Sequence, residues 1–347
     1  MEILQIVDEK AWDDYVIRNG EASFFHLSVW KRVIEQSFGF QPHYICSKDQ
    51  EGRICGVLPL FFIKSRLTGK RLVSLPFSYT CGPLGDSRET VESLIEEGLR
   101  IFEKTGSDYF EIKATHKEEV LQDLGFHESA NYRTYIVRLT DQEQNWRKLH
   151  KSSTQRSINK AKKENVRIQF AGDEESLKQF YRLNLGTSRY HGIPPQPYGF
   201  LKNVWDILVQ DGLAKLVLAE YQKRPVAAAF FFLFEGSVYY LYGASDPEYL
   251  FCRPNHLLLW ETMLWAIENN YRFFDLGRVS HDNVGLAEFK KRWGAEQRDL
   301  YYYYWPQIRG VGAIDRKGWK YKLATRVWKK VPVWITEKGA FLYKHLG

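Results

Sequence analysis

Hydrophobic and polar residues follow one another along this chain in an order that occurs twice. Each occurrence has a long apolar strand, a second strand with a glycine-containing loop, an amphipathic helix, and a short aromatic and acidic strand. The pieces span 56–65, 71–86, 89–106 and 107–114 in the first copy, and 225–236, 237–245, 256–270 and 271–277 in the second. Gly82 corresponds to Gly243 and Phe110 to Phe274, at offsets of 161 and 164 residues. Such a period is too long for a solenoid and predicts two tandem domains.

The segments around the two copies also carry helix and strand patterns. Helices are predicted at Glu9–Asn19, Ser28–Phe38, 117–124 and Glu174–Leu185, and strands at 43–47, 52–62, 132–139 and 166–171. A loop rich in proline and aromatic residues is expected at 187–197, before a further helix.

This order of elements is typical of an α+β acyltransferase core, in which a mixed sheet splays between its fourth and fifth strands. The gap exposes backbone N–H groups that can hold a carbonyl-bearing substrate. We therefore expect an α+β fold with two duplicated domains, at 1–145 and 166–305, each a mixed central sheet flanked by helices. A basic connecting helix at 146–165 would join them, and a basic helical tail would follow at 306–347.

Composition excludes several classes of protein. The longest apolar run, Val226 to Phe234, has nine residues, whereas a membrane-spanning helix needs about 20. The acidic start lacks the features of a signal peptide, so a cytoplasmic location is expected. The four cysteines show no CxxC spacing, which favours buried, reduced thiols, and the nine scattered histidines predict no metal site. The sequence has no P-loop motif and no GxSxG motif, which excludes P-loop proteins and serine hydrolases of the GxSxG type.

Charge is distributed unevenly along the chain. The net charge is +7, but 306–347 has ten Lys/Arg against two Asp/Glu, which leaves −1 for 1–305. In the tail, an apolar helical stripe (Trp319, Leu323, Val327, Val331) faces a basic set (Lys320, Lys322, Arg326, Lys329, Lys330). The tail therefore fits an anionic membrane surface or tRNA phosphates, unless its stripe packs on the protein body.

A second basic segment lies between the two predicted domains. Arg156, Lys160 and Lys163 share one helical face, opposite Ile158 and Ala161. This face is either the solvated side of a connecting helix or a wall that faces phosphates.

Six segments of the chain resemble the Fem-type peptidoglycan aminoacyltransferases, which are built from two tandem GNAT (N-acyltransferase) domains. They are 23–45, 156–168, 187–192, 238–245, 273–277 and 285–296. The likeness covers residues 10 to 305. The order and spacing of the six segments together are fairly specific. Leu75-Pro76-Phe77 and Gly82-Pro83-Leu84 resemble a Fem-related branch associated with exopolysaccharide export.

The resemblance implies N-acyl transfer, in which an amine attacks an activated carbonyl. Fem-type enzymes take the acyl group from aminoacyl-tRNA and use a nucleotide- or lipid-linked muropeptide as acceptor, whereas ordinary GNAT enzymes use acyl-CoA. No permanent cofactor is implied. The [RQ]xxGx[GA] loop that holds CoA pyrophosphate is not matched at 246–256, where Arg253 and Asn255 are the candidate co-substrate contacts. Ile34 stands where Fem-type sequences often have a substrate-binding lysine.

The resemblance also assigns candidate site residues. Lys290, after Phe289, matches a lysine that holds substrate phosphate or the tRNA terminus and polarises the reacting carbonyl. The alternative is a solvated cation on a helix whose core face is Leu286, Phe289 and Trp293. Asp275, at a strand end, would orient the amine, act as base, or cap the following loop.

Other candidates concern the acceptor. Thr187 and Arg189 match a Thr-x-Arg pair that binds diphosphate, although an exposed loop arginine is equally expected. Tyr240 and Tyr242 share one strand parity, and Tyr242 matches a substrate-contacting tyrosine. Trp30 and Tyr79 would line the cleft from the first domain or serve as ordinary core aromatics.

Three functions follow as expectations. The first is a Fem-like N-acyltransferase acting on a cell-envelope or exopolysaccharide precursor at the inner membrane face. The second is acyl-CoA-dependent acetylation of an amino sugar. The third is a non-catalytic adaptor of polysaccharide assembly, held to membrane or nucleic acid by the tail.

Overall fold

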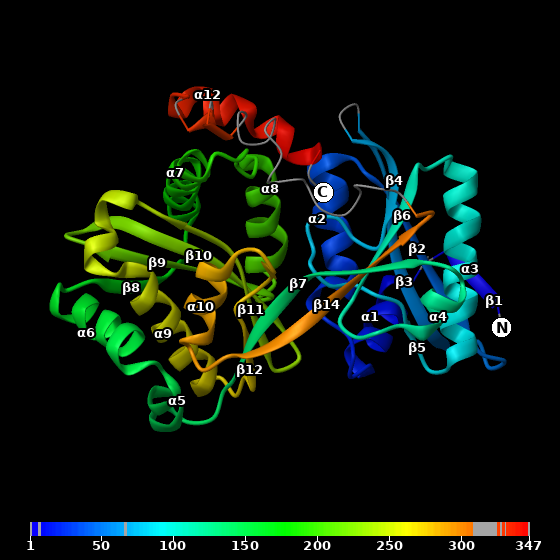
Figure 1. Ribbon diagram of the computed structural model, residues 1–347, viewed down its shortest axis with the longest axis horizontal. Coiled ribbons are helices and arrows are strands. Elements are labelled where there is room, and N and C mark those ends of the chain that lie inside the picture. Colours follow the sequence, from blue (N-terminus) through cyan, green and yellow to red (C-terminus); the bar gives the residue numbers. More distant parts are fainter. Residues whose placement is uncertain are drawn as a thin grey trace. The chain divides into compact units, whose positions relative to one another are not determined.

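The computed structural model describes residues 2–5, 8–65, 68–307, 325–326, 328–329 and 331–345 (Figure 1). Its described residues form two units. Unit 1 consists of the described residues up to Arg133, together with 299–307 and 344–345. Unit 2 consists of Thr134–Arg298 and the described part of 325–343. The chain passes from unit 1 to unit 2 within strand β7 (His127–Arg138) and returns within strand β14 (Glu296–Trp305).

Unit 1 contains a mixed sheet in the order β1-β2-β3-β4-β6-β14. Its other strands are β1 Glu2–Gln5, β2 Gln41–Lys48, β3 Ile54–Ser65, β4 Gly69–Val73 and β6 Tyr109–Ala114, and the short β5 Leu84–Gly85 pairs with β3. Its helices are α1 Glu9–Arg18, α2 Ser28–Phe38, α3 Arg88–Thr105 and α4 Glu119–Asp123. Helix α3 packs Leu94 and Ile95 on Phe110 of the sheet, and α1 and α2 bring Trp12 and Trp30 into the core.

In unit 2 the strands follow the order β7-β12-β11-β10-β9-β8, with parallel and antiparallel pairs. The strands are β8 Arg167–Phe170, β9 Ala214–Tyr221, β10 Arg224–Phe234, β11 Ser237–Ser245 and β12 Phe273–Asp275, and β13 Val279–Ser280 pairs with β7. The helices are α5 Gln142–Lys148, α6 Arg156–Lys163, α7 Glu174–His191, α8 Tyr198–Asn203, α9 Pro254–Glu268, α10 Val284–Lys291 and α12 Val333–Lys338.

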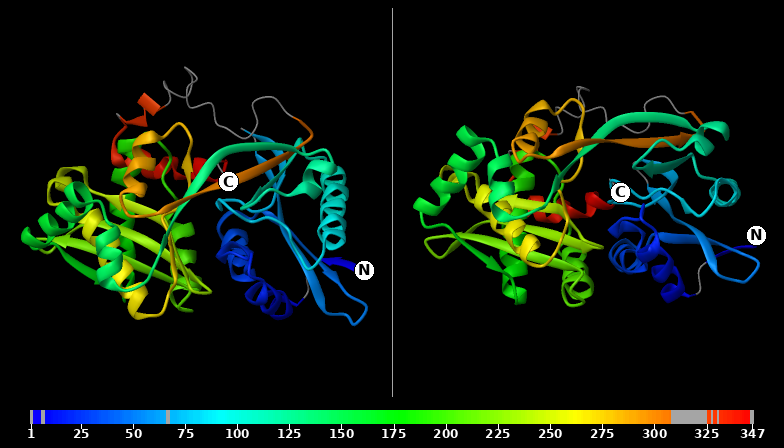
Figure 2. Two further views of the ribbon diagram at one scale, coloured as in Figure 1. Left: turned by 60° about the horizontal axis from the view of Figure 1, so that its bottom comes forward. Right: turned by 90° about the horizontal axis from the view of Figure 1, so that it is seen from below.

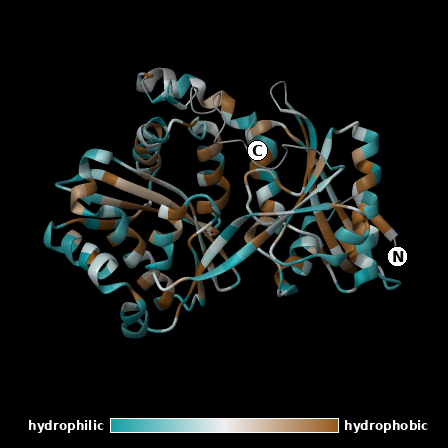
Figure 3. Cartoon of the chain, in the orientation of Figure 1, coloured by the Kyte–Doolittle hydropathy of each residue, from teal (hydrophilic) through white to brown (hydrophobic). Residues whose placement is uncertain are grey.

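Helices cover both faces of the unit 2 sheet (Figure 2). On one face, α6 and α9 enclose a core that includes Ala229 and Phe231 of β10. On the other, Phe180 of α7 packs edge-on against Phe230, with ring centroids 4.9 Å apart. Because both faces are buried, β10 is apolar along nearly its whole length (Figure 3).

The predicted duplication is confirmed at the level of topology. In unit 1, β3 pairs antiparallel with β4, α3 crosses over, and β6 returns parallel to β4. In unit 2, β10, β11, α9 and β12 repeat this path. The second strand of the first copy is shorter than predicted, since it was expected to reach Gly82 but β4 ends at Val73 and the chain then turns toward β5.

The prediction of a loop over 187–197 is also partly wrong. Helix α7 continues six residues beyond Leu185, to His191, and ends at Gly192, whose φ of 74° suits a left-handed C-cap. Thr187 and Arg189 therefore lie on a helix. The basic face of α6 is as predicted, with Ile158 and Ala161 fully buried and Arg156, Lys160 and Lys163 exposed.

Most of the predicted basic tail cannot be compared with the structure. Trp319, Lys320, Lys322, Leu323, Val327 and Lys330 lie outside the described residues. Farther on, the structure has α12 and a 3-10 helix at Gly339–His345.

Across the described part of the chain, every helix is too short or too polar to cross a bilayer.

Two glycines inside helices offer a matched test of this packing. A Cβ on Gly98 of α3 would lie 2.9 Å from the ring of Phe110, which is fully buried, whereas a Cβ on Gly186 of α7 would meet nothing within 4 Å. We expect Gly98→Ala to lower the free energy of unfolding by about 1–3 kcal/mol and Gly186→Ala to raise it by up to about 1 kcal/mol. Urea denaturation followed by circular dichroism measures both. Equal stabilisation by the two substitutions would contradict the packing of α3 on β6.

Candidate functional site

The candidate site of unit 2 lies where strands β11 and β12 stop pairing. Their parallel register covers only three residue pairs, Ser237 to Tyr239 with Phe273 to Asp275. Strand β11 continues to Ser245, while β12 ends at Asp275. The sheet is thus open at the carboxyl end of β12, where binding sites of such sheets collect.

Asp275 is buried at this opening. Its Oδ1 accepts a hydrogen bond from Thr134 Oγ1 at 2.5 Å and another from the backbone N–H of Gly277 at 2.7 Å. The second bond caps the turn that follows β12, which is the structural role foreseen for this residue. The carboxylate therefore fixes the path of the chain into residues 276–280.

Lys290 points inward from helix α10 and is only 5% exposed. Its Nζ donates to the carbonyl oxygen of Gly277 at 2.7 Å and to that of Arg278 at 3.4 Å. Burial lowers the pKa of Lys290 to about 8, an effect that Asp275 opposes and Arg278 reinforces. The ammonium is thus still mostly protonated at neutral pH, although it is buried.

The alternative expectation of a solvated Lys290 is wrong. Leu286, expected on the core side of α10, is 38% exposed, whereas Trp293 is fully buried beside the inward-facing lysine. The inward position of Lys290 is stabilised because two backbone carbonyls and a neighbouring carboxylate compensate the buried charge.

Gly277 completes the group that we name the β12 corner (Asp275, Gly277, Arg278 and Lys290). Its φ is 80°, and a Cβ there would lie 2.9 Å from the carbonyl oxygen of Tyr240 and 3.8 Å from Lys290 Nζ. Glycine is therefore required for the close approach of this turn to β11. Within the β12 corner, Lys290 is a buried cation beside the open end of the sheet, where a positive charge can stabilise a developing oxyanion or a phosphate.

A β-bulge in β11 separates Tyr240 from Tyr242. Tyr240 pairs with Phe231 and Tyr242 with Phe230, so that Leu241 is the extra residue. Tyr240 consequently packs with the core on the α9 face, whereas Tyr242 contacts Phe200 of α8 on the opposite face. The prediction that both tyrosines share a face is wrong, because it assumed an unbroken period of two.

Tyr242 lies in an aromatic cluster with Phe200, Phe232 and Tyr343. Burial raises the pKa of Tyr242 well above its usual value, and the neighbouring Tyr343 hydroxyl adds to the rise. Tyr343 comes from the 3-10 helix at Gly339–His345. The C-terminal segment thus covers the strand residue that the resemblance places at the acceptor.

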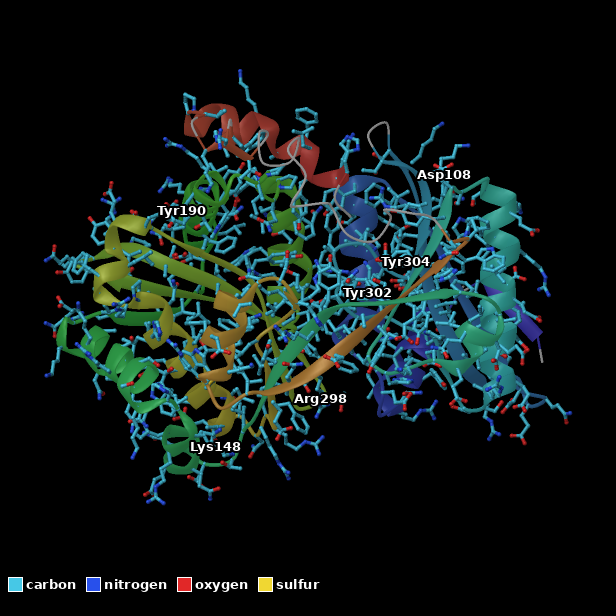
Figure 4. All side chains as sticks on the ribbon, in the orientation of Figure 1. Asp108, Lys148, Tyr190, Arg298, Tyr302 and Tyr304 are labelled. Atoms are coloured by element: carbon cyan, nitrogen blue, oxygen red, sulfur yellow. The ribbon has the colours of Figure 1, made fainter. Side chains whose placement is uncertain are left out.

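Thr187 and Arg189 connect α7 to neighbouring segments. The Thr187 hydroxyl donates to the carbonyl of Ser245 at 3.0 Å and accepts from the N–H of the same residue at 2.8 Å, so it ties the helix to the end of β11. Arg189 Nε donates to the carbonyl of Lys329 at 3.4 Å. The next residue, Tyr190, is 58% exposed at the end of the helix (Figure 4).

The remaining candidates are distributed over both units. Phe289 stacks edge-on with His256 near the start of α9, at a centroid distance of 5.4 Å. Arg253 has a left-handed φ of 57° directly before that helix, and Asn255 lies in its first turn. Trp30 and Tyr79 belong to unit 1, where each packs edge-on against Phe25 in the core.

Three residues that contact the predicted site residues were not themselves predicted from the sequence as site residues. Gly277 carried a visible signal, because it is the glycine that ends the aromatic and acidic segment 271–277. Thr134 and Tyr343 are 141 and 68 residues away from Asp275, and no local pattern links them to it. Only the fold shows that they belong to the site.

The chain resembles known acyltransferases in sequence. The acetyltransferase (GNAT) domain family matches residues 148–291. The lipid II:glycine glycyltransferase of Staphylococcus saprophyticus is 22% identical over 85% of this chain and 90% of that protein. A protein of the same name from Staphylococcus aureus is 39% identical over a stretch that covers 18% of this chain and 16% of the relative.

Solved structures show the same fold. The crystal structure of FemX has a TM-score of 0.72, with 18% identity over 87% of this chain and 97% of that one. A tandem GNAT protein from the clavulanic acid biosynthesis pathway has a TM-score of 0.54, with 10% identity over 87% of this chain and 97% of that one. Together with the GNAT family match, these structures confirm the expected α+β tandem GNAT fold.

The burial of Lys290 predicts a specific pH dependence of stability. Between about pH 8 and 10.5 the unfolded chain keeps a proton that the folded chain has lost, so the free energy of unfolding rises with pH in this window. In Lys290→Met that contribution disappears. We expect the wild type to gain roughly 3 kcal/mol over the variant across this window. Urea denaturation at pH 7.5 to 10.5 measures it.

Lys291→Met is the matched control, because Lys291 is exposed and forms only a surface ion pair with Glu288. We expect its stability to follow that of the wild type at every pH. If Lys290→Met also follows the wild type at every pH, folding does not lower the pKa of Lys290.

Proposed function

We propose that this chain is a Fem-type N-acyltransferase of the GNAT superfamily and transfers an aminoacyl group from aminoacyl-tRNA to an amine of a lipid-linked peptidoglycan precursor. The GNAT domain match and the relatives named as glycyltransferases support the N-acyltransferase class. We extend the proposal to a donor and an acceptor because several relatives are named lipid II:glycine glycyltransferase. The observation that carries the proposal is the buried ammonium of Lys290 at the open end of the unit 2 sheet.

The proposed reaction forms one C–N bond and breaks one C–O bond, and one proton passes from the nitrogen side to the oxygen side. A neutral amine of the acceptor attacks the ester carbonyl of the donor, and negative charge develops on the carbonyl oxygen. Lys290 stabilises this charge, because a fixed cation in a poorly solvated site interacts more strongly with it than water would. The ribose oxygen then leaves with the electron pair of the ester bond and is protonated, while the new amide loses the proton of the amine. Asp275 acts by holding the turn that Lys290 contacts.

The loop before α9 favours aminoacyl-tRNA over acyl-CoA. A CoA site needs several free backbone N–H groups at a helix N-terminus. Here the Arg253 N–H is bonded to Leu250, the His256 N–H is bonded to Arg253, and Pro254 has no N–H. Asn255 alone could contribute a backbone donor among these four residues, which is too few to hold a pyrophosphate.

Arg189 and Thr187 support the acceptor side of the proposal. The guanidinium carries two amino groups besides the Nε that bonds Lys329, and such a group suits diphosphate oxygens. Thr187 would act indirectly, by fixing α7 against β11. An exopolysaccharide precursor remains an alternative acceptor, and attachment to the inner membrane face through the cationic tail is part of the same proposal.

The donor assignment predicts a clear preference. We expect the protein to transfer a radiolabelled amino acid from aminoacyl-tRNA to lipid II and to show no transfer from acetyl-CoA to lipid II or to glucosamine. Thin-layer chromatography of the lipid fraction measures the product. Acetylation without aminoacyl transfer would replace our proposal with the CoA-dependent alternative.

Two substitutions separate the proposed roles. We expect Lys290→Ala to lower kcat about 10²- to 10³-fold, since one oxyanion-stabilising group is worth about 2.7–4 kcal/mol. Arg189→Ala should mainly raise KM for the acceptor, by roughly tenfold or more. Lys178→Ala, which removes an exposed cation paired with Glu175 on the same helix as Arg189, should change neither. Wild-type kinetics in Lys290→Ala with an intact fold would overturn the role of Lys290.

A further inference from the structure

One edge of unit 2 carries five exposed cations that form no ion pair with any residue the structure describes. They are Lys151, Arg156, Lys160, Lys163 and Arg292, which we name the basic belt. Neighbouring cations behave differently: Lys162 pairs with Glu261 at 3.2 Å, and Lys291 pairs with Glu288 at the same distance. The belt therefore concentrates positive charge that the surrounding carboxylates leave uncompensated.

Backbone contacts make the belt continuous with the candidate site. Arg292 lies two residues after Lys290, and its carbonyl accepts from the His150 N–H at 2.9 Å and from Thr154 Oγ1 at 3.1 Å. These bonds fix the end of α10 against 150–155, the segment that leads into α6 (Figure 1). The cations thus follow a path from the neighbourhood of Lys290 to the far end of α6.

The apolar side of α6 shows which kind of partner the belt suits. A helix that binds a lipid surface exposes apolar side chains among its cations. In α6, Ile158 and Ala161 are fully buried in the unit 2 core. The side that faces solvent offers only charged and polar groups, and the exposed Arg156, Lys160 and Lys163 lie on it. Such a surface fits a chain of phosphates rather than a bilayer.

We propose that the basic belt binds the phosphate backbone of the donor tRNA and guides its aminoacylated end toward Lys290. The inference rests on the proposed function for the identity of the donor and adds the surface that recognises it. Contacts of this kind neutralise phosphates and release counterions, so they contribute affinity that falls with salt and carries no base specificity.

The test is the salt dependence of tRNA binding by the full-length chain. Deacylated, 5′-labelled tRNA is titrated with protein in filter-binding assays from 50 to 300 mM KCl. We expect R156A/K160A/K163A to bind more weakly and to reduce the slope of log K against log salt by about 2 to 3, because each phosphate contact contributes about 0.7–0.9. The charge-matched control R53A/R88A/R100A removes three exposed cations of unit 1 and should keep the wild-type slope.

The outcomes separate the belt from the proposed function. An unchanged slope in the belt variant, with its circular dichroism spectrum intact, overturns the belt. Equal loss in both variants shows a general charge effect and also overturns it. If the belt variant instead loses binding to vesicles containing 30% phosphatidylglycerol and keeps tRNA binding, the surface recognises lipid. Wild-type protein that binds tRNA through the belt but transfers no amino acid contradicts the proposed function and leaves the belt standing.

Discussion

The buried ammonium of Lys290 is the interaction on which the unit 2 site depends. It joins α10 to the turn after β12 through the carbonyls of Gly277 and Arg278, and Asp275 holds the same turn from the other side. A charge in this position is costly unless acceptors surround it. Because the same contacts compensate the charge and shape the turn, the fold and the proposed chemistry share one set of atoms.

Unit 1 contains a related arrangement of a buried lysine and a loop. Its buried Lys113, in β6, donates to the carbonyls of Leu75 and Ser78 in the loop that follows β4. Both units therefore hold an irregular loop with a lysine ammonium, and in both units that loop lies beside a parallel strand pair that covers only three residue pairs. The duplication has kept this architecture in both copies, whereas the individual site residues that the Fem-type resemblance matches, Lys290 among them, lie in the second.

Most of the fold could be predicted from the sequence, whereas the site could be predicted only in part. The period of apolar residues predicted α2 at Ser28–Phe38 and the buried side of α6, because these elements pack by one face. It could not reveal the bulge at Leu241, since an extra residue leaves no mark in composition. The length of α7 depended on the cap at Gly192, and the covering of Tyr242 by Tyr343 depended on tertiary contact.

The titration of the Lys290 side chain tests the central claim most directly. Protein labelled with ¹³C and ¹⁵N at lysine is observed by NMR from pH 6 to 11, and the Lys290 resonance is assigned by comparison with Lys290→Arg. The account predicts a pKa of about 8 for this one lysine, well below the ordinary value of 10.5. A Lys290 resonance that titrates near 10.5, together with the exposed lysines, would show that the ammonium is solvated and does not organise the site.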